Sequence, residues 1–197
     1  MVTKRKATVA KLAVVDGRWR APEGQPLRLD LACGDRKAEG HLGVDKYQTP
    51  STDFLFDLLT FPWPCDDGVV DSINCSHFFE HIPGILRPRF MDECCRILKQ
   101  GSQMVIVVPD GDSHRAIQDY THQWPPVCAE SFLYFNKEWR TREKLTHGLY
   151  EMTCDFDFGY GFSLDADISM KNHEQQQFAL KHYRNHSNDL IVTLTKK

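Results

Sequence analysis

The stretch LRLDLACGDRKAEGHLGVD, residues 27–45, decides the fold of this chain. Residues 27–32 alternate between apolar and polar side chains and then become apolar, as a buried β-strand does. Gly34 ends that segment, and residues 42–44 form a second short apolar segment, which Asp45 closes. We therefore expect two strands joined by a tight turn, in which small side chains let backbone N–H groups approach a ligand closely.

Three further apolar segments extend the pattern. Residues 54–56, 69–75 and 104–108 each predict a strand, and the last is almost wholly apolar, as a central parallel strand is. Residues 88–99 predict an amphipathic helix that precedes the last of these strands. Strands that alternate with helices or loops in this way favour a parallel, doubly wound α/β sheet.

The C-terminal part is harder to interpret. Residues 114–150 are rich in aromatic side chains and are interrupted by Pro125–Pro126. Residues 151–164 predict a strand with alternating aromatics, residues 173–186 a polar helix and residues 190–195 a strong last strand. The two strands are expected to form an antiparallel pair at the edge of the sheet.

The composition is that of an ordinary globular protein of the cytoplasm. The chain has 197 residues, of which 41% are hydrophobic and 26% charged, and its net charge is −3. This charge does not favour nucleic acid, and no apolar run approaches the roughly 20 residues that cross a bilayer. The seven cysteines form no C-x-x-C pair and are expected to be free thiols in a reducing compartment.

Two parts of the chain are expected. Residues 1–26 form a basic N-terminal extension without the apolar stretch of a signal peptide, and residues 27–197 form a single domain. The extension is expected to be a solvated terminus, with residues 9–15 as a short strand or helix at the domain's edge. The sequence does not indicate an oligomeric state.

The ends of the predicted strands are expected to meet. Right-handed crossovers place the carboxyl ends of parallel strands at one edge of the sheet, where ligands bind near the switch point. The residues that directly follow the predicted strands should therefore surround one crevice: Cys33–Gly34, Asp45, Asp57, Ser76–His77 and Pro109–Asp110.

Three acidic residues at adjacent strand ends suit a nucleoside. Asp45 is placed to accept two hydrogen bonds from ribose hydroxyls, and Asp57 to accept one from an adenine amino group. With Asp30 they suit a cationic or neutral tail better than a pyrophosphate, which favours G-x-G-x-x-G and a long helix. Residues 36–40 are too short for such a helix. The alternative is that these acids only cap turns.

At this point the chain resembles a known family. LDLACGD at residues 29–35 is similar to the first motif of class I S-adenosylmethionine (SAM)-dependent methyltransferases, and Gly43–Val44–Asp45 is similar to their acidic second motif. Residues 56–82 resemble the region through their third and fourth strands, and residues 89–110 the following helix, turn and fifth strand. The resemblance covers about residues 27–112 and is closest to small members with a short first loop.

The resemblance implies SAM as the cofactor and a seven-stranded, Rossmann-like sheet whose last strand is antiparallel. It also implies a set of cofactor-binding residues at the strand ends. Asp30 would support the first turn and the amino end of SAM, Asp45 would hold the ribose, and Asp57 with the Leu58 backbone would recognise adenine. The residues implied near the methionine moiety, the sulfonium and the acceptor are Ala32, Cys33, Gly34, Ser76 and His77.

The sequence departs from the family pattern at three places. Ala32 replaces the first glycine, Arg36 stands where a third glycine is usual, and Gln100–Gly101–Ser102 replaces Pro-Gly-Gly. Alanine costs little if its φ is negative, and Arg36 is placed to reach the methionine carboxylate. The departures leave a catalytically degenerate SAM-fold binding protein as an alternative. An NAD-dependent oxidoreductase is another, although the glycine fingerprint is absent.

Residues 77–81, HFFEH, also fit H-x-x-E-H, the pattern of one class of zinc peptidases. Two histidines at i and i+4 would share one helix face. Pro83 and Gly84 interrupt that helix, however, and Glu93 is the available third ligand. We therefore expect no metal site, and we expect His81 to be a buried, hydrogen-bonded histidine under the crevice.

Methyl transfer is an in-line displacement in which the protein mainly supplies proximity and alignment. A general base is needed only when the acceptor must lose a proton, and His77, Asp110 and His114 are the candidates. The acceptor is not identified by the sequence: an N-P-P-Y tetrad is absent, and Pro64–Cys65 precedes the fourth strand, so neither class of DNA methyltransferase is supported. The aromatic residues 123–139 suit a roof over the pocket, core packing or a dimer surface equally.

Overall fold

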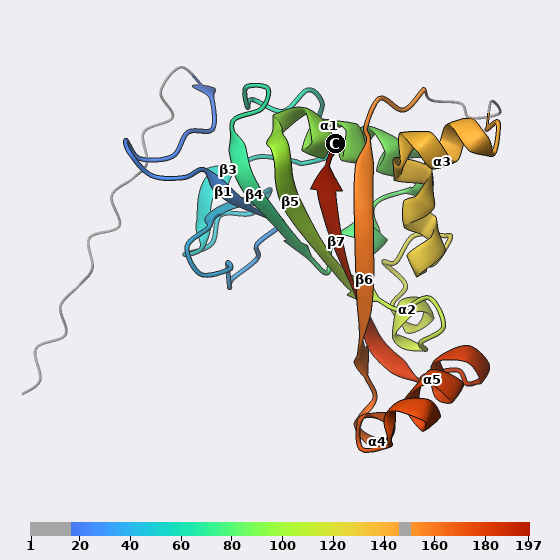
Figure 1. The fold of residues 1–197 in the computed structure, drawn as a ribbon. Helices are drawn as coiled ribbons and strands as arrows, with labels where there is room; N and C mark the ends of the chain where they lie inside the picture. Colours follow the sequence, from blue (N-terminus) through green and yellow to red (C-terminus); the bar gives the residue numbers. More distant parts are fainter. Residues whose placement is uncertain (1–16, 146–150) are drawn as a thin grey trace, which may run out of the picture.

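The computed structural model describes residues 17–145 and 151–197. Its centre is a seven-stranded sheet with the strand order β3-β2-β1-β4-β5-β7-β6 (Figure 1). The first five strands pair in parallel, whereas β7 is antiparallel to both of its neighbours. The strands are β1 Arg28–Leu31, β2 Leu42–Asp45, β3 Thr52–Leu55, β4 Val70–Ser76, β5 Leu98–Pro109, β6 Phe156–Leu164 and β7 Ser187–Lys196.

The helices are short, apart from two. The longer ones are α1, which connects β4 to β5, and α5, which precedes β7. The bounds are η2 Phe79–His81, η3 Gly84–Leu86, α1 Arg87–Ile97, α2 Arg115–Gln118, η4 Ala129–Phe135, α3 Lys137–Arg142, α4 Ala166–Ser169 and α5 His173–His182. Within the described residues, no helix has the length and apolar character needed to cross a membrane.

The predicted α/β fold with a mostly parallel seven-stranded sheet is confirmed. The predicted antiparallel pair at the edge of the sheet is also confirmed: β6 forms the edge, and β7 lies between β5 and β6 and runs antiparallel to both. The predicted strand over 151–164 begins only at Phe156, and the predicted helix over 173–186 ends at His182, where Tyr183 adopts an extended conformation.

The core lies against one face of the sheet. Leu29 on β1, Ile73 on β4 and Met104 on β5 are neighbours across the strands and are buried. The predicted apolar side of α1 covers them: Phe90, Met91, Cys94 and Ile97 are fully buried. Each such aliphatic or aromatic side chain contributes roughly 1.5–3 kcal/mol of hydrophobic stabilisation.

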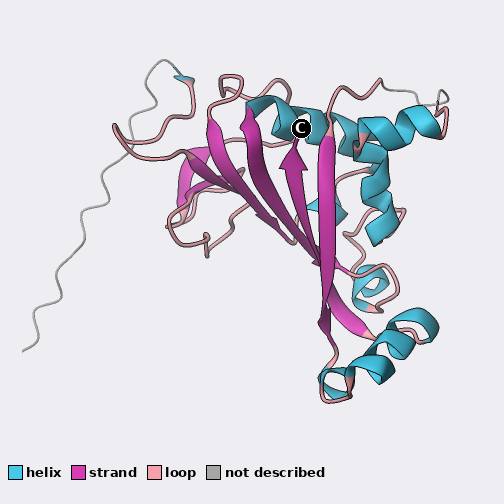
Figure 2. Ribbon diagram, in the orientation of Figure 1, coloured by secondary structure: helices cyan, strands magenta, loops and turns pink. Residues whose placement is uncertain are grey.

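The opposite face of the sheet has no helical layer in the described residues. Figure 2 shows the helices gathered on one side, and on the other side Asn74, Val105 and Thr193 are only half-buried. The β1–β2 and β2–β3 connections, residues 32–41 and 46–51, are shorter than the roughly twelve residues that a helical crossover needs. Here the winding departs from the expected doubly wound arrangement.

The segment before β1 packs on the core face. Trp19 is buried and stacks on Phe54, close to Trp63. Arg18 and Arg20 both form ion pairs with Asp66. Residues 1–16, including the predicted short element at 9–15, lie outside the described residues. The division of the chain at residue 26 stays a prediction.

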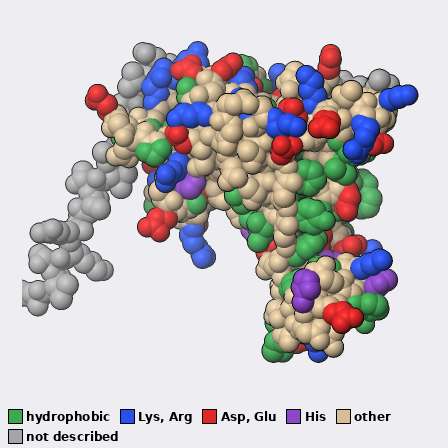
Figure 3. Space-filling model, in the orientation of Figure 1, with side chains coloured by type: hydrophobic (Ala, Val, Ile, Leu, Met, Phe, Trp, Pro, Cys, Tyr) green, Lys and Arg blue, Asp and Glu red, His purple; other side chains and the backbone are tan. Residues whose placement is uncertain are grey.

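A small lobe extends from the sheet beyond α2. It consists of α4 and α5 and lies at the lower end of β6 and β7 in Figure 1. Figure 3 shows hydrophobic side chains gathered where this lobe meets the body of the protein. At that junction a cavity of about 760 Å³ lies between β6, α5 and η4, and its lining includes Phe162, Leu180 and Ala129.

Candidate functional site

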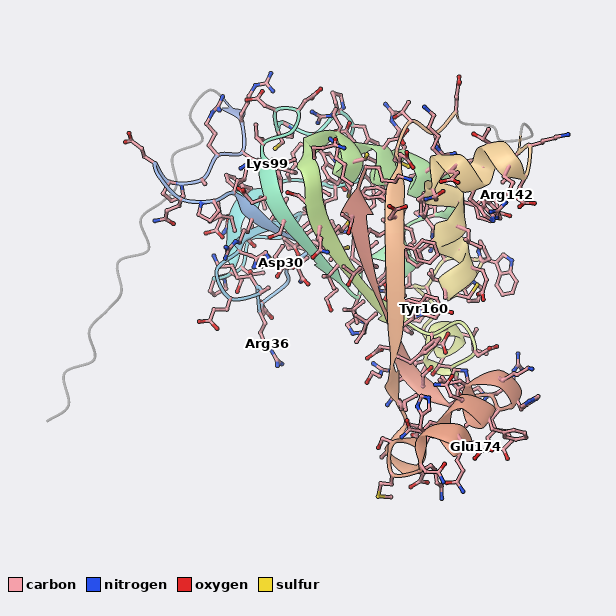
Figure 4. All side chains as sticks on the ribbon, in the orientation of Figure 1. Asp30, Arg36, Lys99, Arg142, Tyr160 and Glu174 are labelled. Carbon is pink, nitrogen blue, oxygen red and sulfur yellow. The ribbon has the colours of Figure 1, made fainter. Side chains whose placement is uncertain are left out.

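A cavity of about 400 Å³ lies at the carboxyl edge of the sheet. Ala32 follows β1, Asp45 ends β2, and Asp57 and Leu58 come shortly after β3; all four line this cavity. In Figure 4 Asp30 and Arg36 mark this edge, and Lys99 marks the opposite one. The strand order reverses beside it, between β1 and β4, which is where open α/β sheets bind ligands.

Asp45 holds the turn that surrounds the cavity. Its Oδ2 accepts a hydrogen bond of 2.9 Å from the Gly34 amide, and its Oδ1 accepts one of 2.9 Å from the Tyr47 amide. Each carboxylate oxygen has a second lone pair, so both can still accept a hydrogen bond from a ligand. Asp57 is exposed and caps its own turn, with Oδ1 accepting from the Leu59 amide at 3.0 Å.

Asp30 does not line the cavity. It is buried, and its carboxylate accepts hydrogen bonds from the Ala38 amide at 2.6 Å and from the Asn74 side chain at 2.7 Å. Of the three carboxylates that were expected to converge, Asp45 and Asp57 line the cavity. Asp30 does not, and it instead holds the loop after β1 through its hydrogen bond to Ala38.

The turn after β1 and strand β2 pack directly on each other. Cys33 is buried, and burial, with the neighbouring charges of Asp45 and Asp30, raises the pKa of its thiol to about 11. A Cβ at Gly43 would lie 2.6 Å from the Cys33 sulfur and 2.2 Å from the Ser51 carbonyl oxygen. Only glycine therefore fits at position 43. The raised pKa keeps the Cys33 thiol protonated, so this side chain serves packing rather than nucleophilic attack.

Ala32 has a left-handed backbone, with φ of 56°. The expectation that alanine costs little at this position required a negative φ and is wrong. The neighbouring Gly34 has a similar φ of 53°. Left-handed backbone costs an L-residue about 1–2 kcal/mol, so the departure from glycine at position 32 is a source of strain.

Arg36 is exposed, and Figure 4 shows its side chain extending away from the sheet. It does not line the cavity at the strand ends. Ser76 is the last residue of β4 and is half-buried.

His77 is the second strained residue at this edge. It follows β4 directly with φ of 55°, and its amide donates to the Val107 carbonyl. Its side chain is 43% exposed, and its Nδ1 lies 3.4 Å from Oε1 of Glu80 without forming a hydrogen bond. Burial raises the pKa of Glu80 above its ordinary value, because the nearby histidines only partly offset the loss of solvent.

None of the three candidate bases lines the cavity of Asp45, although His77 directly precedes Phe78, which does. Asp110 is buried, accepts a short hydrogen bond from Ser187 and lies 3.6 Å from His186 Nε2. Asp110 and His186 line the larger cavity beside the α5 lobe. His114 is exposed, and its ring nitrogen is 3.2 Å from the Asn185 side chain.

The cavity of Asp45 also contains residues that the sequence did not single out. Phe56 and Phe78 supply apolar walls, and Thr121 approaches from the loop after α2. His81 was expected to be buried under the crevice, but it is half-buried and lies in the wall. Thr121 comes from the region in which no periodic pattern could place individual residues.

The aromatic residues 123–139 do not line this cavity. Phe132 and Phe135 pack against Phe79 in the core, whereas Trp124 is exposed. Core packing is the part of the expectation that the structure bears out.

Solved structures with the same fold are available for comparison. A SAM-dependent methyltransferase from Archaeoglobus fulgidus superimposes with a TM-score of 0.58 and 18% identity, over 88% of this chain and 87% of that one. This chain has the fold of the SAM-dependent methyltransferases. No protein-family model and no curated protein sequence matches it.

The methyltransferase fold recurs in a larger protein. Phosphoethanolamine N-methyltransferase 2 of Haemonchus contortus, solved with phosphomonomethylethanolamine and S-adenosylhomocysteine, superimposes with a TM-score of 0.52 and 11% identity. The match covers 89% of this chain and 50% of that protein. At these identities the likeness describes the methyltransferase fold alone.

Proposed function

We propose that this chain is a SAM-dependent methyltransferase. The observation that carries the proposal is the cavity of about 400 Å³ at the sheet's switch point, which Asp45 and Asp57 line together with apolar side chains. A cavity of this size with a few polar groups is typical of small-molecule sites.

The residues present fit SAM. The free lone pairs of Asp45 suit the two ribose hydroxyls, and Asp57 suits the adenine amino group. Phe56, Leu58 and Phe78 offer apolar walls to the purine. We assign the methionine moiety to the turn of Ala32, Cys33 and Gly34, and Asp30 to the support of that turn.

When bound, SAM would supply a methyl group already activated by a sulfonium. The protein would hold the acceptor in line with it and exclude water, which accounts for up to about 7–11 kcal/mol in favourable cases. We assign Ser76 and His77 to the acceptor side. His77 is the preferred base for an acceptor that loses a proton, because it directly precedes Phe78 in the cavity wall, whereas Asp110 and His114 lie elsewhere. Strained backbone often marks such sites.

Calorimetry with S-adenosylhomocysteine tests the cofactor assignment. Asp45→Ala and the milder Asp45→Asn should weaken binding by about 1–3 kcal/mol, because charged hydrogen bonds to the ribose are lost. Asp157→Asn, a change on the exposed edge strand β6, should leave the affinity unchanged. Equal affinity in the Asp45 variants, with the fold retained by circular dichroism, would refute the site.

Two further measurements separate the alternatives. A titration with NAD should give no binding, and saturable binding of NAD in preference to S-adenosylhomocysteine would favour an oxidoreductase. Incubation with SAM and fractions of a small-molecule extract should release S-adenosylhomocysteine with at least one fraction. Tight binding of SAM without any release would favour the degenerate binding protein.

A further inference from the structure

One carboxylate and two imidazoles meet beside the candidate cofactor cavity, whose wall includes one of them, His81. Glu80, His81 and His122 each offer one ligand atom, and these three atoms lie within 4.8 Å of one another. We propose that these residues form a binding site for a divalent transition-metal ion of the Zn²⁺ type. The proposal concerns metal binding alone and stands independently of methyl transfer.

Glu80 is the first reason. Its side chain is 6% exposed, and neither carboxylate oxygen accepts a hydrogen bond from any described residue. Buried carboxylates are normally paired or coordinate metals, because an isolated one loses its hydration without compensation. The nearest partner, His77 Nδ1, lies at 3.4 Å without hydrogen-bond alignment. Within the described residues, the buried carboxylate therefore has no hydrogen-bonded cation.

The histidine tautomers are the second reason. Thr121 donates its single hydroxyl proton to Asp119 at 2.7 Å, so its oxygen can only accept from His81 Nδ1, which is 3.1 Å away. His122 Nδ1 lies 3.0 Å from the Ala116 carbonyl, which can only accept. In their neutral form both rings therefore donate through Nδ1 and keep a lone pair at Nε2, as metal-binding histidines do.

The three residues are held together by backbone contacts. The Gln123 amide donates to the Glu80 carbonyl at 2.8 Å. The buried guanidinium of Arg87 donates to the carbonyls of Ile82, Gln123 and Pro125, so it joins the segment after η2 to the segment after α2. The His81 and His122 rings lie 4.8 Å apart in an edge-to-face arrangement. The cluster therefore depends on a rigid junction between two segments.

Two nitrogens and one carboxylate oxygen form the donor set of catalytic zinc sites, which keep a fourth position open. Zn²⁺ binds such ligands at about 2.0–2.2 Å, which places two tetrahedral ligand atoms about 3.3–3.6 Å apart. Ligand atoms that lie up to 4.8 Å apart would therefore close by up to about 1.5 Å through side-chain rotation. Of the three proposed ligands His81 lines the cavity of Asp45, so the metal would lie beside that cavity. Water or an oxygen atom of a small ligand would complete the coordination there.

Besides His77, the charged groups that face the cluster from the described residues are the Arg87 guanidinium, which interacts electrostatically with Glu80, and the Asp119 carboxylate. Asp119 Oδ2 lies 3.8 Å from His122 Nε2, so a doubly protonated His122 paired with Asp119 is the competing explanation. It predicts a cluster occupied by protons, with no stoichiometric metal. Metal titration separates the two explanations.

The test uses the full chain after chelator treatment, titrated with Zn²⁺ against a chromogenic competitor. One equivalent should bind tightly, and Glu80→Gln and His122→Gln should each weaken binding more than about 10-fold, the least that losing even an outer-shell partner costs. His173→Gln, on the exposed start of α5, should bind as the unchanged chain does. No stoichiometric site, or equal affinity in all variants, would overturn the proposal.

Co²⁺ substitution gives a readout that does not depend on the variants folding. The unchanged chain should show the visible ligand-field bands of a four- or five-coordinate nitrogen and oxygen site. Thiolate charge-transfer bands would place the metal on cysteines and overturn the assignment. S-adenosylhomocysteine binding in the same samples keeps the two proposals distinguishable, since either can fail while the other holds.

Discussion

Glu80 and Glu93 are both buried, but their surroundings are opposite. Glu93 on α1 accepts hydrogen bonds from both Arg96 Nε and Nη2, at 2.8 and 2.7 Å, and from the Trp63 amide at 2.7 Å. Burial works against its ionisation, but these hydrogen bonds outweigh burial and lower the pKa of that carboxyl. Glu80 has no hydrogen-bond partner among the described residues, and burial raises the pKa of its carboxyl.

The difference separates a part of the molecule built for stability from a part built for binding. Glu93 and Arg96 join α1 to the loop before β4, where the polar groups of this pair are satisfied. The carboxyl edge of the sheet instead holds the strained backbones of Ala32 and His77 beside the unpaired Glu80. Such strain persists where the surrounding structure enforces it, and it clusters at active sites and ligand clamps.

The largest expected effect comes from breaking the satisfied glutamate. Arg96→Met should lower the free energy of unfolding by about 2–4 kcal/mol, because it leaves Glu93 partly buried without its bidentate partner. Urea unfolding followed by tryptophan fluorescence measures this. A loss below about 1 kcal/mol, which is the size expected for an exposed ion pair, would show that the hydrogen-bonded Glu93 does not stabilise the fold as the comparison requires.

Lowering the pH should also reduce the stabilisation from the Glu93–Arg96 pair, but by less than the Arg96→Met substitution does. Because the folded-state pKa of Glu93 is lowered, its contribution is present above the unfolded pKa and is lost as the pH falls through the folded value. Arg96 keeps its hydrogen bonds to the Cys65 and Trp63 carbonyls, so acid removes only part of what Arg96→Met removes.

Unfolding free energies measured from pH 7 down to pH 3 should therefore fall less steeply in Glu93→Gln than in the unchanged chain. Asp71, whose pKa is also lowered through Lys99, continues to titrate in both proteins and serves as a common background. Identical slopes would show that Glu93 does not contribute in this way.

Relief of strain at the binding edge should give a still smaller, opposite effect. Ala32→Gly should raise the free energy of unfolding by about 0.5–1 kcal/mol, because the left-handed penalty disappears while the unfolded chain gains some entropy. Gly34→Ala is the mirror control: it has φ of 53° and open space around its Cβ position. It should lose about 1 kcal/mol. Stability changes of the same sign in both variants would refute the strain argument.

The smallest expected effect is at Glu80. In metal-free protein Glu80→Gln should change the free energy of unfolding by about 0–1 kcal/mol in the stabilising direction, since a buried unpaired charge is removed and no hydrogen bond is lost. Thermal unfolding beside Glu93→Gln, which should be clearly destabilised, measures the contrast. Comparable losses in the two variants would mean that Glu80 has a structural partner.

The parts of the fold that follow from local pattern were predictable. The alternation in residues 27–32 and the apolar run at 104–108 located β1 and β5, and the position of Asp45 and Asp57 directly after apolar segments placed both at one edge. Such arguments work because hydrophobic periodicity locates the strands, and because right-handed crossovers then allow only a few ways to connect them in one sheet.

The rest depended on information that the sequence pattern does not contain. His122 belongs to a loop without periodicity, so nothing in the sequence joined it to His81, and Glu93 was considered as the third ligand although it bonds Arg96. The sign of φ at Ala32 is set by how the turn packs beside β2, which no residue type reveals. The lack of helices on one face of the sheet, in the part of the chain that the structure describes, follows from the short β1–β2 and β2–β3 connections, which the doubly wound pattern did not take into account.

A crystal structure of this chain soaked with S-adenosylhomocysteine tests the central claim most directly. We predict the ribose hydroxyls on the Asp45 carboxylate and the adenine between Asp57, Leu58 and Phe78, with the sulfur near Ser76 and His77. Density for the ligand in the larger cavity beside Asp110, or no density at saturating concentration, would contradict the account.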